Sequence, residues 1–212
     1  IGNRYKRQLN AATAAPVTAT AAAAELPRRK IRRALLILTV LVFSKYFYIA
    51  CMTNYFTFFL MDKFAFSVQD AQYSLFAFLA ASAAGTVIGG PLGDRFGRKY
   101  VIWGSILGAA PFTLLLPYAN LVCTIALAVI IGLVISSAFS AILVYATDLM
   151  PGRVGMIAGL FFGLMFGLGG LGSAFFGWLA DRTSIEFIFR VSALLPLMGI
   201  ITGFLPDVER KR

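Results

Sequence analysis

The 212-residue sequence contains no histidine and only two cysteines, and charged side chains make up just 13% of it. A globular domain usually carries about 25% charged residues. Cys51 and Cys123 each lie inside an apolar run, so we interpret both as apolar filler rather than as a disulfide or a metal pair. Because histidine and clustered cysteine are the usual ligands of transition metals, we expect no metal site.

Apolar residues dominate instead, at 59% of the chain with a mean hydropathy of +0.83. A membrane-spanning helix needs about 20 apolar residues. Six segments meet or nearly meet this length, and Pro111 and Pro196 are expected to kink the third and the sixth. The segments cover residues 34–61, 72–93, 100–118, 121–149, 155–180 and 185–205.

The composition divides the chain into three parts. Residues 1–33 form an Ala/Thr-rich stretch that ends in a basic run, which we interpret as a cytoplasmic linker. Residues 34–207 form the six-helix bundle, and residues 208–212 form a basic tail. The predicted fold class is therefore an all-α membrane protein with six transmembrane helices.

The basic residues are distributed unevenly between the two ends of these helices. If the chain starts in the cytoplasm, 15 of its 19 lysines and arginines lie on the cytoplasmic side, and only Lys63 and Arg182 lie on the other. The positive-inside rule predicts this asymmetry for a multi-pass protein with both ends in the cytoplasm. The net charge of +10 is then a signal of orientation, and a nucleic-acid partner is disfavoured.

No acidic residue lies in the middle of an apolar segment. All nine are found at segment ends or between segments, so the chain offers no membrane carboxylate for a proton relay. An intramembrane enzyme would have no histidine, cysteine pair or buried carboxylate to use. We therefore expect neither an enzyme nor a bound cofactor.

Lys45 is the exception among the charged residues. It lies about 12 residues, or about 18 Å, into the first helix, where a charge costs at least about 2.5 kcal/mol. Its side chain should face either a water-filled cavity or a structural partner in the bundle. Tyr48 and Tyr55 share its helical face, and Asn54 adds polarity further along.

The fourth helix carries a row of hydroxyl groups. Ser136 and Ser140 are one turn apart, with Tyr145 nearby. Such a row can line a polar path or form hydrogen bonds between helices. Both interpretations stay open, and the predicted substrate and proton pathway comprises Lys45, Tyr48, Asn54, Tyr55, Ser136, Ser140 and Tyr145.

Two helices carry small residues at intervals of four. The stripes contain Gly85 and Gly89 in the second helix, and Gly155, Gly159, Gly163 and Gly167 in the fifth. Small residues allow helix backbones to touch in lipid, so both stripes predict close helix packing. These contacts are either static helix packing or smooth faces that slide past each other during a rocking motion.

Residues 90–99 read G-P-L-G-D-R-F-G-R-K between two apolar segments. This pattern resembles the short cytoplasmic loop signature of the major facilitator superfamily. The resemblance implies that Asp94 takes part in a latch between two halves, while the basic residues could equally bind acidic lipid headgroups or mark orientation. The predicted motif residues are Gly90, Gly93, Asp94, Arg95, Gly97, Arg98 and Lys99.

A second, weaker copy of the motif is visible at residues 177–182, which read G-W-L-A-D-R. Each copy follows the second helix of a group of three, so the two copies are expected on opposite sides of the membrane. This arrangement is typical of the 3+3 inverted repeat within one six-helix half of a major facilitator protein.

Longer runs are similar to the fosmidomycin resistance family of this superfamily. They include F-S-K-Y-F-Y at 43–48, A-A-G-T-V-I-G-G-P-L-G-D at 83–94 and G-R-K-Y-V-I-W-G-S-I-L-G at 97–108. The resemblance implies a bacterial inner-membrane exporter of twelve helices, exchanging drug for protons, of which this chain would supply helices seven to twelve. The expected partners are an absent amino-terminal six-helix half, membrane lipids and a small anionic substrate that Lys45 could bind.

Two alternatives remain beside this leading interpretation. The first is a facilitator for an endogenous anionic metabolite, and the second is a six-helix membrane module that does not transport. The proton gradient is the expected energy source of the leading interpretation.

Overall fold

The structure is a computed structural model that describes residues 28–205, and this part of the chain is helical throughout, without a β-strand. Six of its helical segments are long and apolar enough to cross a membrane, as predicted. The elements are α3 (Arg28–Phe64), α4 (Val68–Phe96), α5 (Arg98–Leu115), η1 (Leu116–Tyr118), α6 (Leu121–Asp148), η2 (Pro151–Arg153), α7 (Val154–Arg182), α8 (Ile185–Ser192) and η3 (Leu195–Phe204).

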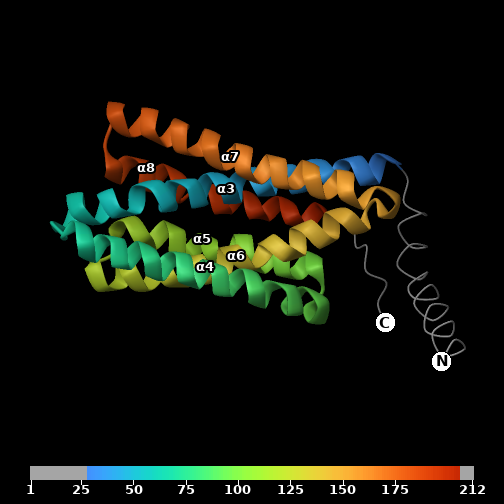
Figure 1. Cartoon of the computed structure of the whole chain (residues 1–212), viewed down its shortest axis with the longest axis horizontal. Helices are drawn as coiled ribbons and strands as arrows, with labels where there is room; N and C mark the ends of the chain where they lie inside the picture. Colours follow the sequence, from blue (N-terminus) through green and yellow to red (C-terminus); the bar gives the residue numbers. More distant parts are fainter. Residues whose placement is uncertain (1–27, 206–212) are drawn as a thin grey trace, which may run out of the picture.

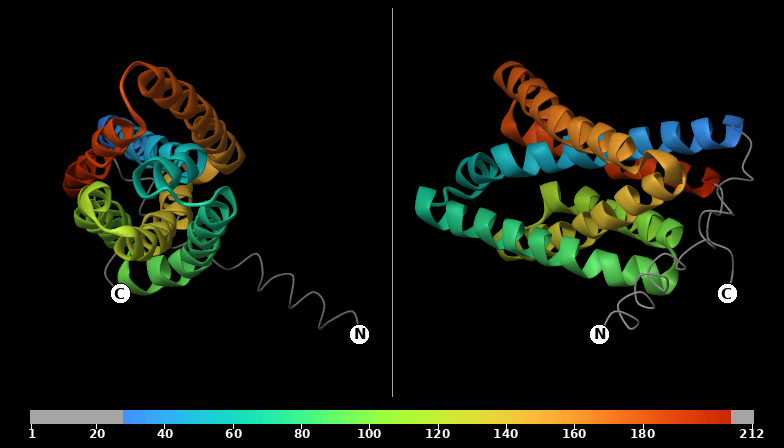
Figure 2. Two further views of the ribbon diagram at one scale, coloured as in Figure 1. Left: turned by 90° about the vertical axis from the view of Figure 1, so that its left-hand side faces the viewer. Right: turned by 45° about the vertical axis from the view of Figure 1, so that its right-hand side comes forward.

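The helices run side by side and alternate in direction (Figure 1). One group contains α3, α7 and α8, and the other contains α4, α5 and α6 (Figures 1 and 2). The start of α3 and the end of η3 lie at the same end of the bundle. The carboxyl ends of α4 and α7 lie at opposite ends, as the inverted repeat of their G-x-L-x-D-R motifs predicts.

The helix boundaries follow local chemistry. The side chains of Ser67, Asn120 and Ser184 cap the starts of α4, α6 and α8 by accepting a hydrogen bond from a backbone N–H three residues on. The helix α3 begins at Arg28, so the last six residues of the predicted linker are helical. Residues 1–27 of the predicted linker and the predicted tail at 208–212 lie outside the described part.

The last span changes its helix type in the middle. The α-helix α8 ends at Ser192, and a 3₁₀-helix begins at Leu195, directly before Pro196. Proline lacks an N–H and cannot continue the α-helical ladder, so the predicted distortion at Pro196 is confirmed. At Pro111, by contrast, α5 continues as an α-helix.

Hydroxyl groups from other helices bind the carbonyls around this break. Ser44 of α3 donates to Leu195 O at 2.5 Å, and Thr113 of α5 donates to Ala193 O at 3.0 Å. A broken helix is stable in a membrane when neighbouring groups satisfy its freed carbonyls in this way.

Glycines bring α4 and α6 into backbone contact. A Cβ atom at Gly85 would lie 2.1 Å from Leu133 O, and one at Gly89 would lie 2.1 Å from Ser137 O. The predicted helix packing is therefore present at these two positions. On α6, Gly132 approaches Phe78 O in the same way.

The glycine stripe of α7 behaves differently. A Cβ atom at Gly155, Gly159, Gly163 or Gly167 would meet no atom of the described chain within 4 Å. The expected packing of this stripe is therefore not formed inside the bundle. The glycines of α7 that do contact α3 are Gly172, against Phe47 and Ala50, and Gly177, against Tyr55.

This contrast predicts how substitutions act on stability. Gly89→Ala should lower the free energy of unfolding by about 1–3 kcal/mol, because the added methyl group overlaps the α6 backbone. Gly104→Ala in α5, which meets no atom within 4 Å, is the matched control and should be neutral or slightly stabilising. Thermal unfolding of the purified protein in detergent measures both, and equal effects would contradict the packing described here.

Candidate functional site

A layer of polar side chains crosses the middle of the bundle. The buried apolar residues form two clusters, one containing Leu38, Ile102 and Ile142, and the other containing Phe56, Ala109 and Ile131. In two helices, buried polar residues lie between these clusters along the sequence: Ser44 and Lys45 in α3, and Ser136 and Ser137 in α6. Buried Ser105 of α5 joins this layer through its contact with Ser137.

Lys45 is the charged member of this layer. It lies near the middle of the 37-residue helix α3, and only 1% of its surface is exposed. The side chain therefore points into the protein rather than into lipid. Snorkelling to the membrane surface is excluded for this conformation by the burial.

Two aromatic rings surround the Lys45 ammonium group. The Nζ atom lies 5.4 Å from the centroid of the Tyr46 ring and 5.6 Å from that of Phe139 in α6. Within residues 28–205, Nζ forms no hydrogen bond and no ion pair with another side chain or carbonyl. Cation–π contacts are worth about 2 kcal/mol when desolvated, which falls short of what an unpaired buried charge costs.

Three serines of the layer, by contrast, have hydrogen-bond partners. Ser44 binds Leu195 O, and Ser137 donates to Val134 O at 2.7 Å. Ser105 and Ser137 also form a short hydroxyl–hydroxyl contact that joins α5 to α6. Lys45 is the one charged group of the described layer, and no counter-charge lies beside it there.

Tyr48 and Ser140 share the unpaired character of Lys45. The hydroxyl groups of both are buried and have no hydrogen-bond partner. Tyr48 follows Lys45 by one turn of α3, but the hydroxyl of Ser140 faces α4, where it lies 3.9 Å from the position of a Cβ at Gly90. Ser136, which lies one turn before Ser140 in α6, is also buried.

The remaining predicted pathway residues do not gather around Lys45. Tyr55 donates to Ser173 O of α7 at 2.8 Å and thereby ties α3 to α7. Asn54 is exposed and donates to Ala50 O of its own helix at 2.8 Å. Tyr145 is buried in the apolar cluster nearer to the start of α3.

Ser44 and Ser105 were missed as site residues. Ser44 directly precedes Lys45, and its role depends on the break in the last span, which places Leu195 O opposite it. The role of Ser105 depends on its contact with Ser137 of α6, which the spacing within α5 does not indicate. A comparison of the depth of each polar residue within its own helix would have found both.

The motif at residues 90–99 is a helix end rather than a loop. Gly90 to Phe96 form the last two turns of α4, and α5 begins at Arg98, so Gly97 alone joins the two helices. Its φ of 93° lies in the region that glycine adopts freely, which explains the third glycine of the motif. Its N–H closes α4 by donating to Gly93 O at 3.1 Å.

Arg98 holds this corner against a third helix. Its guanidinium group forms an ion pair with Asp148 at the end of α6 and lies 3.6 Å from Asp94 in the preceding turn. Arg95 is exposed, with its guanidinium 5.6 Å from the Phe96 ring. The motif therefore connects three helices of this bundle, and the predicted latch to another half stays a prediction.

This ion pair can be tested by removing one partner. Arg98→Gln should lower the free energy of unfolding by about 1 kcal/mol, because the half-buried side chain of Asp148 loses its counter-charge. Arg95→Gln, one turn earlier and exposed, should leave it unchanged. Thermal unfolding in detergent distinguishes the two, and the account fails if Arg98→Gln is as harmless as its control.

Metal chemistry finds no support at this site. Among the residues that the structure describes, no three histidine, cysteine or acidic side chains come together. The arrangement instead offers a desolvated ammonium group, a nearby phenol and a polar layer at mid-depth. Chemically, these groups suit the binding of a small anion.

Comparison with known proteins agrees with this architecture. Residues 35–212 match the Major Facilitator Superfamily. The chain is 63% identical over 186 residues to the fosmidomycin resistance protein of Escherichia coli (strain K12), which covers 88% of this chain and 46% of that protein. It is 42% identical over 159 residues to the uncharacterized MFS-type transporter YfnC of Bacillus subtilis (strain 168), covering 75% of this chain and 39% of that protein.

The chain thus spans less than half the length of the curated relatives that it matches. No solved structure matches it. The six apolar spans, the corner built by residues 90–99 and the match over most of the sequence lead to one assignment. The chain belongs to the major facilitator superfamily, as a multi-pass membrane protein with the six-helix architecture of one half of that fold.

Proposed function

We propose that this chain is the carboxyl-terminal half of a secondary transporter that exports a small anionic drug such as fosmidomycin in exchange for protons. It acts as a transporter rather than an enzyme, in the inner membrane of a bacterium. The observation that carries the proposal is the buried ammonium group of Lys45, which has no anionic partner among the described residues.

A substrate anion supplies what Lys45 lacks. A charge-assisted hydrogen bond to a phosphonate or carboxylate is stronger than one between neutral groups, and it strengthens further at low dielectric. The unpaired hydroxyl of Tyr48, one turn away, can donate a second hydrogen bond. The relative with 63% identity bears the name fosmidomycin resistance protein, and fosmidomycin is a phosphonate.

A second six-helix half would complete the transporter. Of the six spans, α4 and α7 are the least buried. The glycine stripe of α7 lines an apolar hollow of about 420 Å³. Substrate sites of this superfamily lie between two halves that rock against each other. We propose that the absent half packs on these faces and that Lys45 becomes accessible from the shared cavity during the cycle.

Proton coupling requires a titratable group inside the membrane. The described part of this bundle offers no carboxylate for that role. None of the acidic residues described lies at mid-depth in a helix. Lys45 is therefore the proposed coupling residue of this half, or else the coupling carboxylate belongs to the other half. An anion beside Lys45 stabilises the protonated form of its amine, so anion binding and protonation of this group are coupled.

The proposal predicts the effect of Lys45 substitutions in the intact protein. Lys45→Gln should reduce fosmidomycin export by about tenfold or more, because a hydrogen bond to a charged group is lost from a desolvated site. Lys63→Gln is the matched control, since Lys63 belongs to the same helix but binds the carbonyls of Pro117 and Ala119. Uptake into everted membrane vesicles, with and without a pH gradient, measures the export.

Full, pH-dependent export by Lys45→Gln would contradict the proposal. The chain without its other half should not transport, whereas co-expression with an amino-terminal half should restore the activity. Competition by phosphorylated metabolites, stronger than that by fosmidomycin, would favour an endogenous anion as substrate. Stable, monodisperse behaviour of the chain alone, together with no effect of a second half, would favour a module that does not transport.

We also propose that the end of the bundle that holds the start of α3 faces the cytoplasm. The exposed basic residues Arg29, Lys30, Arg95 and Arg153 gather at that end, as the positive-inside rule requires. In a cysteine-free background, Thr183→Cys should react with a membrane-impermeant maleimide in intact spheroplasts, and Gly152→Cys should react only after permeabilisation. The reverse pattern would overturn the orientation.

A further inference from the structure

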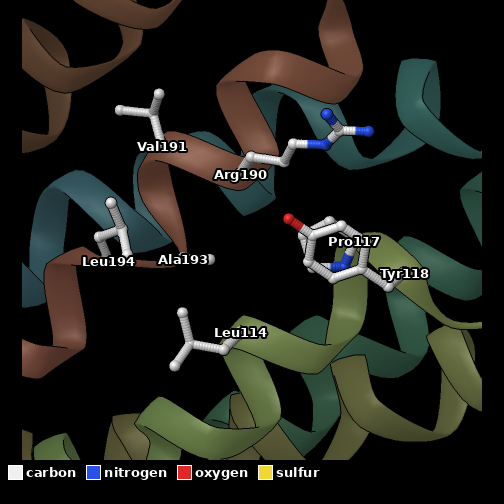
Figure 3. Close-up of a pocket in the computed structure, with 7 residues that line it drawn as sticks. All are labelled: Leu114, Pro117, Tyr118, Arg190, Val191, Ala193 and Leu194. Carbon is white, nitrogen blue, oxygen red and sulfur yellow. The ribbon is translucent and has the colours of Figure 1, made fainter.

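A hollow of about 260 Å³ opens between the end of α5 and the start of the last span (Figure 3). It lies at the end of the bundle opposite to the start of α3. In the end-on view of Figure 2, α5 lies on the left, across the bundle from α7. The hollow is therefore separate from the faces proposed to receive the other half, and its lining residues are Leu114, Pro117, Tyr118, Arg190, Val191, Ala193 and Leu194.

The walls of the hollow are apolar, and one charged residue stands at its edge. Arg190 donates to the carboxylate of Glu186 at 2.6 Å, and its guanidinium lies 5.5 Å from the centroid of the Tyr118 ring. Both members of this ion pair are close to half exposed, at 49% and 41%. An arginine has five N–H donors, so Arg190 can bind a further acceptor without giving up Glu186.

The groups along α8 follow a fixed order of depth. Glu186 lies in the first turn of the helix, at the end of the bundle, and Arg190 lies one turn, or about 6 Å, further in. Val191, Ala193 and Leu194 continue the wall toward the middle of the span. From the membrane surface inward, the protein therefore presents an acid, then a base, and then an apolar hollow.

We propose that this hollow is a binding site for phosphatidylethanolamine. The order of charges on α8 is complementary to this lipid, whose ammonium group lies outermost, followed by the phosphate and the acyl chains. The ammonium group binds Glu186, the phosphate binds Arg190 and the Tyr118 hydroxyl, and an acyl chain occupies the apolar hollow. This inference needs only that the chain spans a membrane, so it stands independently of the proposed substrate.

The same geometry disfavours other occupants. A lipid with a net negative charge can form an ion pair with Arg190, but it places no cation near Glu186. A quaternary ammonium headgroup has no N–H to donate to the Glu186 carboxylate. A free phosphate ion would leave the apolar walls unfilled. Tyr118 is 69% exposed, and an amphipathic ring at a membrane–water interface fits the depth at which a headgroup lies.

Native mass spectrometry of the intact protein tests this site. The protein is released from mixed micelles that contain equal amounts of dioleoyl phosphatidylethanolamine, phosphatidylglycerol and phosphatidylcholine. Phosphatidylethanolamine should be retained at least about threefold over each of the other two, the preference expected for one exposed ion pair. Glu186→Gln should remove this preference, and Arg190→Gln should reduce the retention of all three lipids.

Two further variants separate this site from general effects. Arg182→Gln is the control, since Arg182 is an exposed arginine at the same end that stacks on Trp178 outside the hollow, and it should change nothing. Leu114→Trp keeps both charges but fills the hollow, and it should lower retention. Equal retention of the three lipids, a preference for phosphatidylglycerol, or an unchanged preference in Glu186→Gln would overturn the proposal.

Discussion

The central constraint on this structure is the ammonium group of Lys45, which is buried at mid-depth without an anion among residues 28–205. A charge at the centre of a bilayer is costly and is found where function requires it. In this bundle, Lys45 contacts two aromatic rings while every serine described in the same polar layer but Ser136 has a hydrogen bond to a named partner. Among the described residues of the layer, Ser44, Ser105 and Ser137 are thus hydrogen-bonded, whereas the charge of Lys45 has no counter-charge.

The packing around this layer explains how the charge is held. Gly85 and Gly89 bring the backbones of α4 and α6 into contact, and the ion pair between Arg98 and Asp148 joins the α4–α5 corner to the end of α6. The break at Pro196 lets the carbonyl of Leu195 accept from Ser44, directly beside Lys45 in α3. The α7 stripe remains open, so the same bundle combines a fixed interior with an unpartnered outer face.

Much of the fold could be predicted from the sequence because hydropathy and length decide the spans of a membrane protein. The six segments, the break at Pro196 and the burial of Lys45 followed from local rules. Which glycine stripe packs inside the bundle could not be predicted, because the sequence spacing of four is the same in α4 and α7. The ion pair of Arg98 with Asp148 could not be predicted either, because these residues are fifty positions apart and only the folded chain brings them together.

The candidate site was predictable in part for the same reason. Lys45 and Tyr48 stand out on one face of one helix, whereas Ser44 and Ser105 acquire meaning only when helices from distant parts of the chain are placed at one depth. Asn54 and Tyr55 share the spacing of pathway residues but form hydrogen bonds to backbone carbonyls. Spacing on a helix identifies a face, and it does not identify what that face meets.

The most direct measurement is an experimental structure of the intact protein in the presence of fosmidomycin. The account predicts a phosphonate oxygen within about 3 Å of the Lys45 Nζ, the distance of a charge-assisted hydrogen bond. A phosphonate bound elsewhere, with Lys45 paired to a carboxylate of the other half, would contradict it.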